Sequence, residues 1–120
     1  MRFEDLEVWL NAARLSAEIY RKFRTLRDYS FRDHISKTGL SISSNIAEGF
    51  ERETHKGFIV FLSYAKGSCG ELRSQIHVGM DINYIDSKTG KEWIEETLKI
   101  SSMLSNLIKT RRSFLQNSKS

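Results

Sequence analysis

The chain has 120 residues, of which 39% are hydrophobic and 28% charged, and its formal net charge is +4. This composition is that of a globular protein and excludes a disordered chain. No apolar run approaches the ~18 residues of a membrane span, the acidic N-terminus excludes a signal peptide, and the single cysteine, Cys69, excludes an intrachain disulfide. We therefore expect a soluble cytoplasmic protein with one domain, residues 1–115, and a polar tail, residues 116–120.

Apolar residues recur at three- and four-residue steps in four segments, which predicts amphipathic helices over residues 4–24, 31–50, 54–83 and 90–114. The chain has no proline to interrupt them. Four such helices with short connections predict an all-α, antiparallel up-down-up-down four-helix bundle. The expected core residues are Leu6, Trp9, Tyr20, Ile35, Ile42, Ile46, Phe58, Leu62, Leu72, Ile76, Ile100 and Leu104.

Three hydroxyl side chains stand where helices are expected to begin. Ser30 and Thr89 are each followed three residues later by an acidic residue, which is the order of a capping box. Thr54 precedes the third helix without that partner and is its expected N-cap.

The third predicted helix has two unusual features. It contains four glycines, each costing roughly 1 kcal/mol relative to alanine, which predicts close approach of another helix backbone. It also carries a second apolar stripe, formed by Val60, Tyr64, Gly67, Val78 and Ile82. Either the buried face is unusually broad or this stripe meets another subunit, and we favour the second interpretation.

The stretch SSNIAEGFER, residues 43–52, combines apolar and polar residues in two turns. An antiparallel hairpin of the second and third helices brings these polar groups level with basic and acidic residues across the pair. The stretch is therefore interpreted as a packing segment, not as an active site, with Glu48 partly buried. The expected polar network consists of Asn45, Glu48, Arg52, Lys56 and Glu71.

Three blocks together resemble one family: FEDLEVWLNAARLSAEIY (3–20), SSNIAEGFER (43–52) and FIVFLSYAKGSCGELRSQ (58–75). They are similar to the 23S rRNA intervening-sequence proteins, also called four-helix-bundle proteins, to which the accessory variability protein of diversity-generating retroelements is related. The resemblance implies a small cytoplasmic bundle that assembles as a homopentamer. Some members are encoded in insertions within large-subunit rRNA genes, and the accessory branch binds nucleic acid and a reverse transcriptase. Family members often carry paired basic residues before the NIAEG block, where this chain has Ser36 and Lys37.

Positive charge is concentrated in two stretches. Residues 14–37 contain seven basic side chains against three acidic ones, and residues 109–120 contain four basic and no acidic side chains. In an up-down bundle, the end of the first helix and the starts of the second and fourth gather at one end. The candidate nucleic-acid-binding residues there are Arg21, Lys22, Arg24, Arg27, Arg32, Lys37, Lys88 and Lys91.

Two functions and one neutral interpretation fit these charges. The first function is binding of RNA or DNA through the backbone, which is salt-sensitive and independent of sequence. Readout of bases is not expected, because most of the aromatic residues beside the cluster (Tyr20, Phe23, Tyr29 and Phe31) are expected in the core. The second function is a scaffold for a larger enzyme such as a reverse transcriptase. The neutral interpretation is that the cations only complement helix dipoles and keep the protein soluble.

Residue types that carry catalysis lack the necessary spacing. His34, His55 and His77 form neither the Glu-x-x-His pairs of di-iron bundles nor a zinc pattern. Cys69 falls on the main apolar stripe of its helix and is interpreted as a small core residue. We therefore expect no enzymatic activity, no metal and no cofactor.

Overall fold

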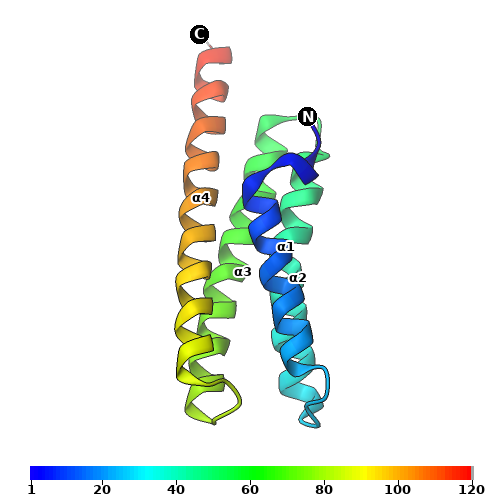
Figure 1. The fold of residues 1–120 in the computed structure, drawn as a ribbon. Helices are drawn as coiled ribbons and strands as arrows, with labels where there is room; N and C mark the ends of the chain where they lie inside the picture. Colours follow the sequence, from blue (N-terminus) through cyan, green and yellow to red (C-terminus); the bar gives the residue numbers. More distant parts are fainter. Residues whose placement is uncertain (120) are drawn as a thin grey trace.

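The computed structural model describes residues 1–119, which form four α-helices and a short 3-10 turn, η1 (Phe3–Asp5). The helices are α1 (Glu7–Phe23), α2 (Tyr29–Phe50), α3 (His55–Asp81) and α4 (Ser87–Lys119). Each runs antiparallel to the one before it, and the molecule is a rod of 54 × 21 × 20 Å (Figure 1). No strand occurs in the described part of the chain, so the predicted all-α four-helix bundle is confirmed.

Two helices begin earlier than predicted. The carboxylate of Asp28 accepts the Phe31 amide at 3.2 Å, so α2 is capped there and not at Ser30. Asp86 accepts the Thr89 amide at 3.0 Å in the same way, and Thr89 therefore lies inside the first turn of α4. An aspartate satisfies the free amides of a first turn as well as serine or threonine does, and the sequence pattern did not rank the competing caps.

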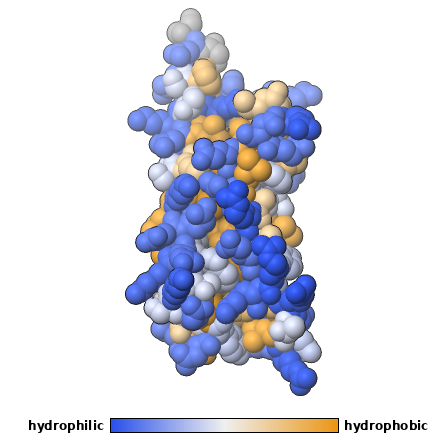
Figure 2. All heavy atoms as spheres, viewed as in Figure 1, coloured by the Kyte–Doolittle hydropathy of each residue, from blue (hydrophilic) through white to orange (hydrophobic). Residues whose placement is uncertain are grey.

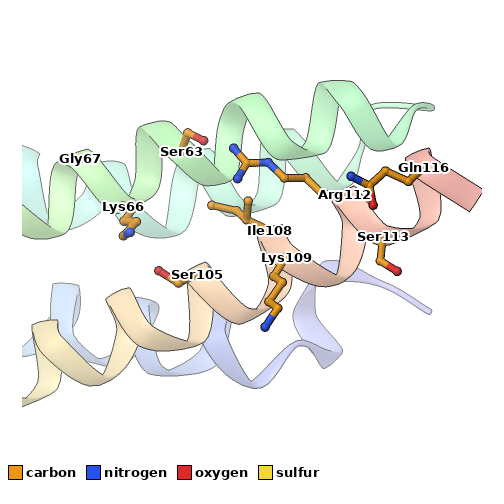
Figure 3. A pocket seen from close by; sticks show the side chains of 9 residues that line it. All are labelled: Ser63, Lys66, Gly67, Ser105, Ile108, Lys109, Arg112, Ser113 and Gln116. Carbon is orange, nitrogen blue, oxygen red and sulfur yellow. The ribbon is translucent and has the colours of Figure 1, made fainter.

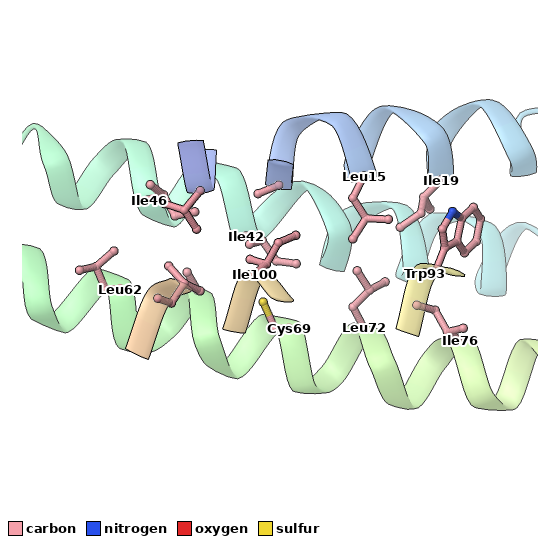
Figure 4. Close-up of a cluster of buried hydrophobic side chains, with 14 of the residues drawn as sticks. Leu15, Ile19, Ile42, Ile46, Leu62, Cys69, Leu72, Ile76, Trp93 and Ile100 are labelled. Carbon is pink, nitrogen blue, oxygen red and sulfur yellow. The ribbon is translucent and has the colours of Figure 1, made fainter. Parts of the chain in front are cut away.

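The core runs the length of the bundle and receives side chains from all four helices (Figure 4). Nine of the twelve predicted core residues are buried: Ile35, Ile42, Ile46, Phe58, Leu62, Leu72, Ile76, Ile100 and Leu104. Leu6 and Trp9 are half-buried against this core. The remaining prediction, Tyr20, is wrong, since 46% of this residue is exposed.

The error at Tyr20 concerns the rotation of α1, not its existence. The apolar side chains that α1 buries are Val8, Ala12, Leu15, Ile19 and Phe23. Successive helical residues are about 100° apart, so burial of Ile19 turns Tyr20 outward. The sequence contains two apolar stripes on α1, and the structure buries the one without Tyr20.

The close packing of α2 on α3 depends on a glycine. A Cβ atom at Gly49 would lie 2.7 Å from Phe61 Cβ and 3.0 Å from Phe58 Cδ1, so only glycine fits there without movement. Thr54 caps α3 as predicted, because its hydroxyl oxygen accepts the Gly57 amide at 3.0 Å. Gly57 itself lies against the side chains of the turn and not against another helix.

The last helix is longer than expected. α4 has 33 residues against 17 in α1, and its C-terminal part extends past the N-terminus of α1 (Figure 1). The helix continues to Lys119, with no glycine or proline after Gly90 to interrupt it, so the predicted helix end at residue 114 is wrong; Ser120 lies outside the described residues. The face over α1, α2 and α4 is mostly hydrophilic, with small hydrophobic patches (Figure 2). Within the described residues, no helix is both long and apolar enough to cross a membrane.

Candidate nucleic-acid interface

A groove of about 590 Å³ lies between the end of α1 and the beginning of α2. We call it the α1/α2 groove, and its lining residues are Tyr20, Arg21, Arg24, Arg32, Asp33, Ser36 and Lys37. Residues three or four positions apart share a helix face, so Arg21 and Arg24 project together from α1. Four cations against one carboxylate give the lining a formal charge of +3.

Most of these cations have no internal partner. Among residues 1–117, whose side chains the structure describes, Arg21, Arg24 and Lys37 form no ion pair and no side-chain hydrogen bond. Arg32 is held in place, since its Nε donates to Asp33 Oδ1 at 2.9 Å and its guanidinium lies 4.6 Å from the centre of the Tyr29 ring. Three positive charges in the groove are therefore available to an anion.

The other predicted contact residues lie at the same end of the bundle but do not line the groove. Lys22 points toward the α3–α4 connection, where its Nζ is 3.7 Å from Asp86 Oδ1. Arg27 is in the α1–α2 turn, and Lys88 and Lys91 are at the start of α4; all three are exposed. The structure thus brings together four of the eight candidates, namely Arg21, Arg24, Arg32 and Lys37.

Hydrogen bonds lower the pKa of two further acids at this end. The pKa of Asp28 is lowered from its ordinary 3.8, chiefly because the Tyr84 hydroxyl donates to it at 2.8 Å. The pKa of Asp86 is lowered in the same direction, chiefly by the Thr89 amide. Neither acid lines the α1/α2 groove, so the positive charge of this end is least opposed there.

The sequence did not predict a second basic groove, of about 860 Å³, between α3 and α4 (Figure 3). We call it the α3/α4 groove; it is lined by Ser63, Lys66, Gly67, Ser105, Ile108, Lys109, Arg112, Ser113 and Gln116. Arg112 extends from α4 toward Ser63 of α3, and no acid is in the lining (Figure 3). The charge of residues 109–120 was the available signal, but only the antiparallel register places Lys66 beside it.

The predicted polar network between α2 and α3 does not form. Glu48 accepts from Arg52 at 3.0 Å, but its side chain is 57% exposed, and an exposed pair at this spacing contributes only about 0.3–0.5 kcal/mol. Asn45 donates to a backbone carbonyl of its own helix, and Glu71 accepts only the Thr38 hydroxyl, at 3.4 Å. Among residues 1–117, Lys56 takes part in none of these interactions. The burial of Ile46 and Gly49 turns Glu48 to the outer face.

Comparison with known proteins assigns the chain to a family. The family model described as 23S rRNA-intervening sequence protein matches residues 4–106. The chain belongs to this family. No curated protein gives a match. A crystal structure of a protein of unknown function, from the S23 ribosomal protein family of Bacteroides thetaiotaomicron VPI-5482, is similar with a TM-score of 0.79 and 20% identity. That match covers 85% of this chain and 98% of the other, and at this identity it shows the fold alone.

The two grooves differ in how much of each lies within the region matched by the model of the 23S rRNA-intervening sequence protein family. The whole α1/α2 groove lies inside the matched region, whereas Lys109 and Arg112 of the α3/α4 groove lie beyond residue 106. We therefore take the α1/α2 groove as the candidate site of this family member.

The second apolar stripe of this family member is exposed on α3 and just after its end. The exposed fractions are 40% for Val60, 57% for Tyr64, 51% for Val78 and 46% for Ile82. A Cβ at Gly67 or Gly70 would meet no atom within 4 Å, so the predicted close helix approach does not occur there within one chain. We call Val60, Tyr64, Gly67, Val78 and Ile82 the α3 stripe.

The potentially reactive side chains of Cys69 and His55 pack against other residues of the bundle. Burial raises the pKa of the Cys69 thiol to about 12, with the nearby Arg73 charge acting in the opposite direction. His55 lies against the end of α4, with its Nδ1 3.2 Å from Arg111 Nη1 and its ring 5.5 Å from that of Phe114. The described residues contain no group of three His, Cys, Asp or Glu side chains that could hold a metal ion.

Proposed function

We propose that this protein is a non-catalytic, cytoplasmic nucleic-acid-associated protein that holds the phosphate backbone of RNA or DNA in the α1/α2 groove. The observation that supports this is the convergence of Arg21, Arg24 and Lys37 in one groove without internal partners. Guanidinium and ammonium groups are the side chains that bind phosphate best, through charge-assisted hydrogen bonds. Arg21 and Arg24 also stand at the C-terminal end of α1, where they complement the helix dipole, but Lys37 lies inside α2, where dipole complementation gives no reason for a cation.

Groups that read a base sequence are scarce in the groove, because its free arginines, which could also pair with guanine, bind phosphates in the proposed complex. Asparagine and glutamine, which pair with adenine edges, are absent from its lining, and its one carboxylate, Asp33, already accepts from Arg32. Contacts to phosphate fix the position of a nucleic acid but carry no sequence information. Unrelated sequences should therefore bind about equally.

A salt titration of the wild-type protein tests this function. We expect the anisotropy of two labelled oligonucleotides of unrelated sequence to report equal affinities. The logarithm of the binding constant should fall linearly with the logarithm of salt concentration, with a slope of about −2 to −3 for three phosphate contacts. Absence of binding at low salt, or a slope near zero, would contradict the proposal.

The α3 stripe supports assembly, and we take a homopentamer as the form, as the resemblance to the family implies. Val60, Tyr64 and Gly67 follow one another at steps of four and three residues, Val78 comes eleven residues (about three turns) after Gly67, and Ile82 comes four residues after Val78. All five therefore fall on one side of the helix, which also carries Glu71 and Ser74. A hydrophobic seam of this kind is buried most simply by a second copy of the chain. Five copies of a +4 chain would carry +20 and repeat the α1/α2 groove around a ring.

A scaffold function is the second candidate, and it rests on the same stripe. If part of the α3 stripe stays exposed after assembly, it offers repeated docking surfaces to a larger enzyme such as a reverse transcriptase. The salt titration separates the two, because the scaffold alone requires no affinity for RNA or DNA.

A further inference from the structure

The α1/α2 groove contains one feature that phosphate binding does not require. Tyr20 lines the groove among its cations, and 46% of this residue is exposed. Among the described residues, no ring, guanidinium or hydrogen-bonding group engages its side chain. A large aromatic side chain is therefore about half-exposed among the cations of the groove.

The other exposed tyrosine at this end is different. Tyr29 is 60% exposed, but the guanidinium of Arg32 already lies over its ring at 4.6 Å. Contacts with Asp33 and Tyr29 together hold the Arg32 side chain in place at the side of the groove. Tyr20 is thus the aromatic face that is open to a ligand, and Arg21, Arg24 and Lys37 are the free charges around it.

We propose that the α1/α2 groove binds single-stranded nucleic acid, with an unpaired base stacked on Tyr20 and the flanking phosphates at Arg21, Arg24 and Lys37. This inference rests on the proposed function and narrows its ligand. Aromatic stacking with a basic track is how proteins hold single strands without reading their sequence, because every base has a π-face. The groove's volume of about 590 Å³ is within the usual range of small-ligand sites.

A duplex does not satisfy this arrangement. Its bases are paired and stacked on one another, so their faces are closed to Tyr20 unless the duplex is opened. A duplex therefore offers the groove only phosphates. The affinity for a single strand should exceed that for the same strand in a duplex by the contribution of the stack.

Three ligands and three forms of the protein test the inference. The ligands are a labelled single strand, the same strand in a duplex, and an equally long strand with abasic sites, which keeps the phosphates and removes the bases. The proteins are the wild type, Tyr20→Leu, which removes the ring, and Tyr20→Phe, which keeps it. Because Tyr20 lies outside the core, all three should melt alike.

We expect the wild type and Tyr20→Phe to bind the single strand more tightly than the other two ligands. Tyr20→Leu should lose about 5- to 150-fold in affinity for the single strand, the range of one base–aromatic stack, and should bind the duplex and the abasic strand as the wild type does. Equal binding of all three ligands by the wild type, or an unchanged single-strand affinity in Tyr20→Leu, would overturn the inference and leave the phosphate-binding function standing. Failure of every ligand to bind at low salt would overturn both.

Discussion

Replacement of Gly49 by alanine should lower the free energy of unfolding by about 1–2 kcal/mol, although alanine is the better helix former. The new Cβ would lie 2.7 Å from Phe61 Cβ and 3.3 Å from the carbonyl oxygen of Phe58, which are atoms that cannot rotate away. Overpacking of this kind costs about 1–3 kcal/mol, and the helix preference of alanine offsets at most about 1 kcal/mol of it. Thermal unfolding followed by circular dichroism measures the loss as a melting temperature several degrees lower.

Gly70→Ala is the matched control. It makes the same chemical change in α3, at a position where a Cβ meets no atom within 4 Å. Only the helix preference then acts, so this variant should be more stable than the wild type by about 0.5–1 kcal/mol. If the Gly49→Ala protein melts at or above the wild-type temperature, α2 and α3 do not pack as closely at Gly49 as the structure shows.

Double replacement of Tyr64 and Val78 by arginine should convert the proposed homopentamer to a monomer of 13.9 kDa. Both side chains are more than half exposed in the single chain, so the change should leave the fold of the subunit intact. In a buried seam, each arginine would lose its hydration without a partner and would face like charge from its neighbour. Light scattering after gel filtration measures the mass directly.

Leu98→Arg is the control for this experiment, because Leu98 is 51% exposed on α4, outside the α3 stripe. Its mass should equal that of the wild type, which for a homopentamer is five times 13.9 kDa. A wild-type monomer, or an unchanged mass in the double variant, would refute the role of the stripe. A wild-type dimer or tetramer would preserve that role and refute the pentamer.

Hydrophobic periodicity predicted where the helices lie but not how each one is rotated. On α1 the stripe that ends at Tyr20 and the stripe that contains Ile19 are both apolar, and tyrosine is compatible with either face. Packing against the other three helices decides between them, and that information is not local to α1. The exposure of Tyr20, on which the single-strand inference depends, could therefore not be predicted from the sequence.

The candidate site was predictable in part, for the same reason. The topology places all eight candidate cations at one end, as expected, but only rotation and register decide which of them share a groove. Arg21 and Arg24 converge with Lys37 of the neighbouring helix, whereas Lys22 turns to Asp86. In the SSNIAEGFER segment the tight packing at Gly49 was foreseeable from a glycine inside a helix. The predicted polar network was wrong, because Glu48 accepts a hydrogen bond from its neighbour Arg52 on the surface instead of pairing across the two helices.

The most direct test of the α1/α2 groove compares two triple variants in one anisotropy titration with a single-stranded oligonucleotide. The first is Arg21→Gln, Arg24→Gln and Lys37→Gln. The second replaces Arg2, Lys56 and Lys99 by glutamine; these are exposed cations that line neither basic groove. Both variants reduce the formal charge of the chain from +4 to +1, so they match in net charge; in the control, Arg2 is ion-paired with Glu4 and Asp5, whereas Lys56 and Lys99 form no ion pair within residues 1–117.

The groove variant should lose roughly 100-fold in affinity, at about 1 kcal/mol for each of three phosphate contacts, and its salt slope should rise from about −2 to near zero. The control should stay within roughly threefold of the wild type, because charges distant from the ligand are screened. Equal weakening by the two triple variants would show that binding follows net charge alone and would contradict the assignment of the α1/α2 groove.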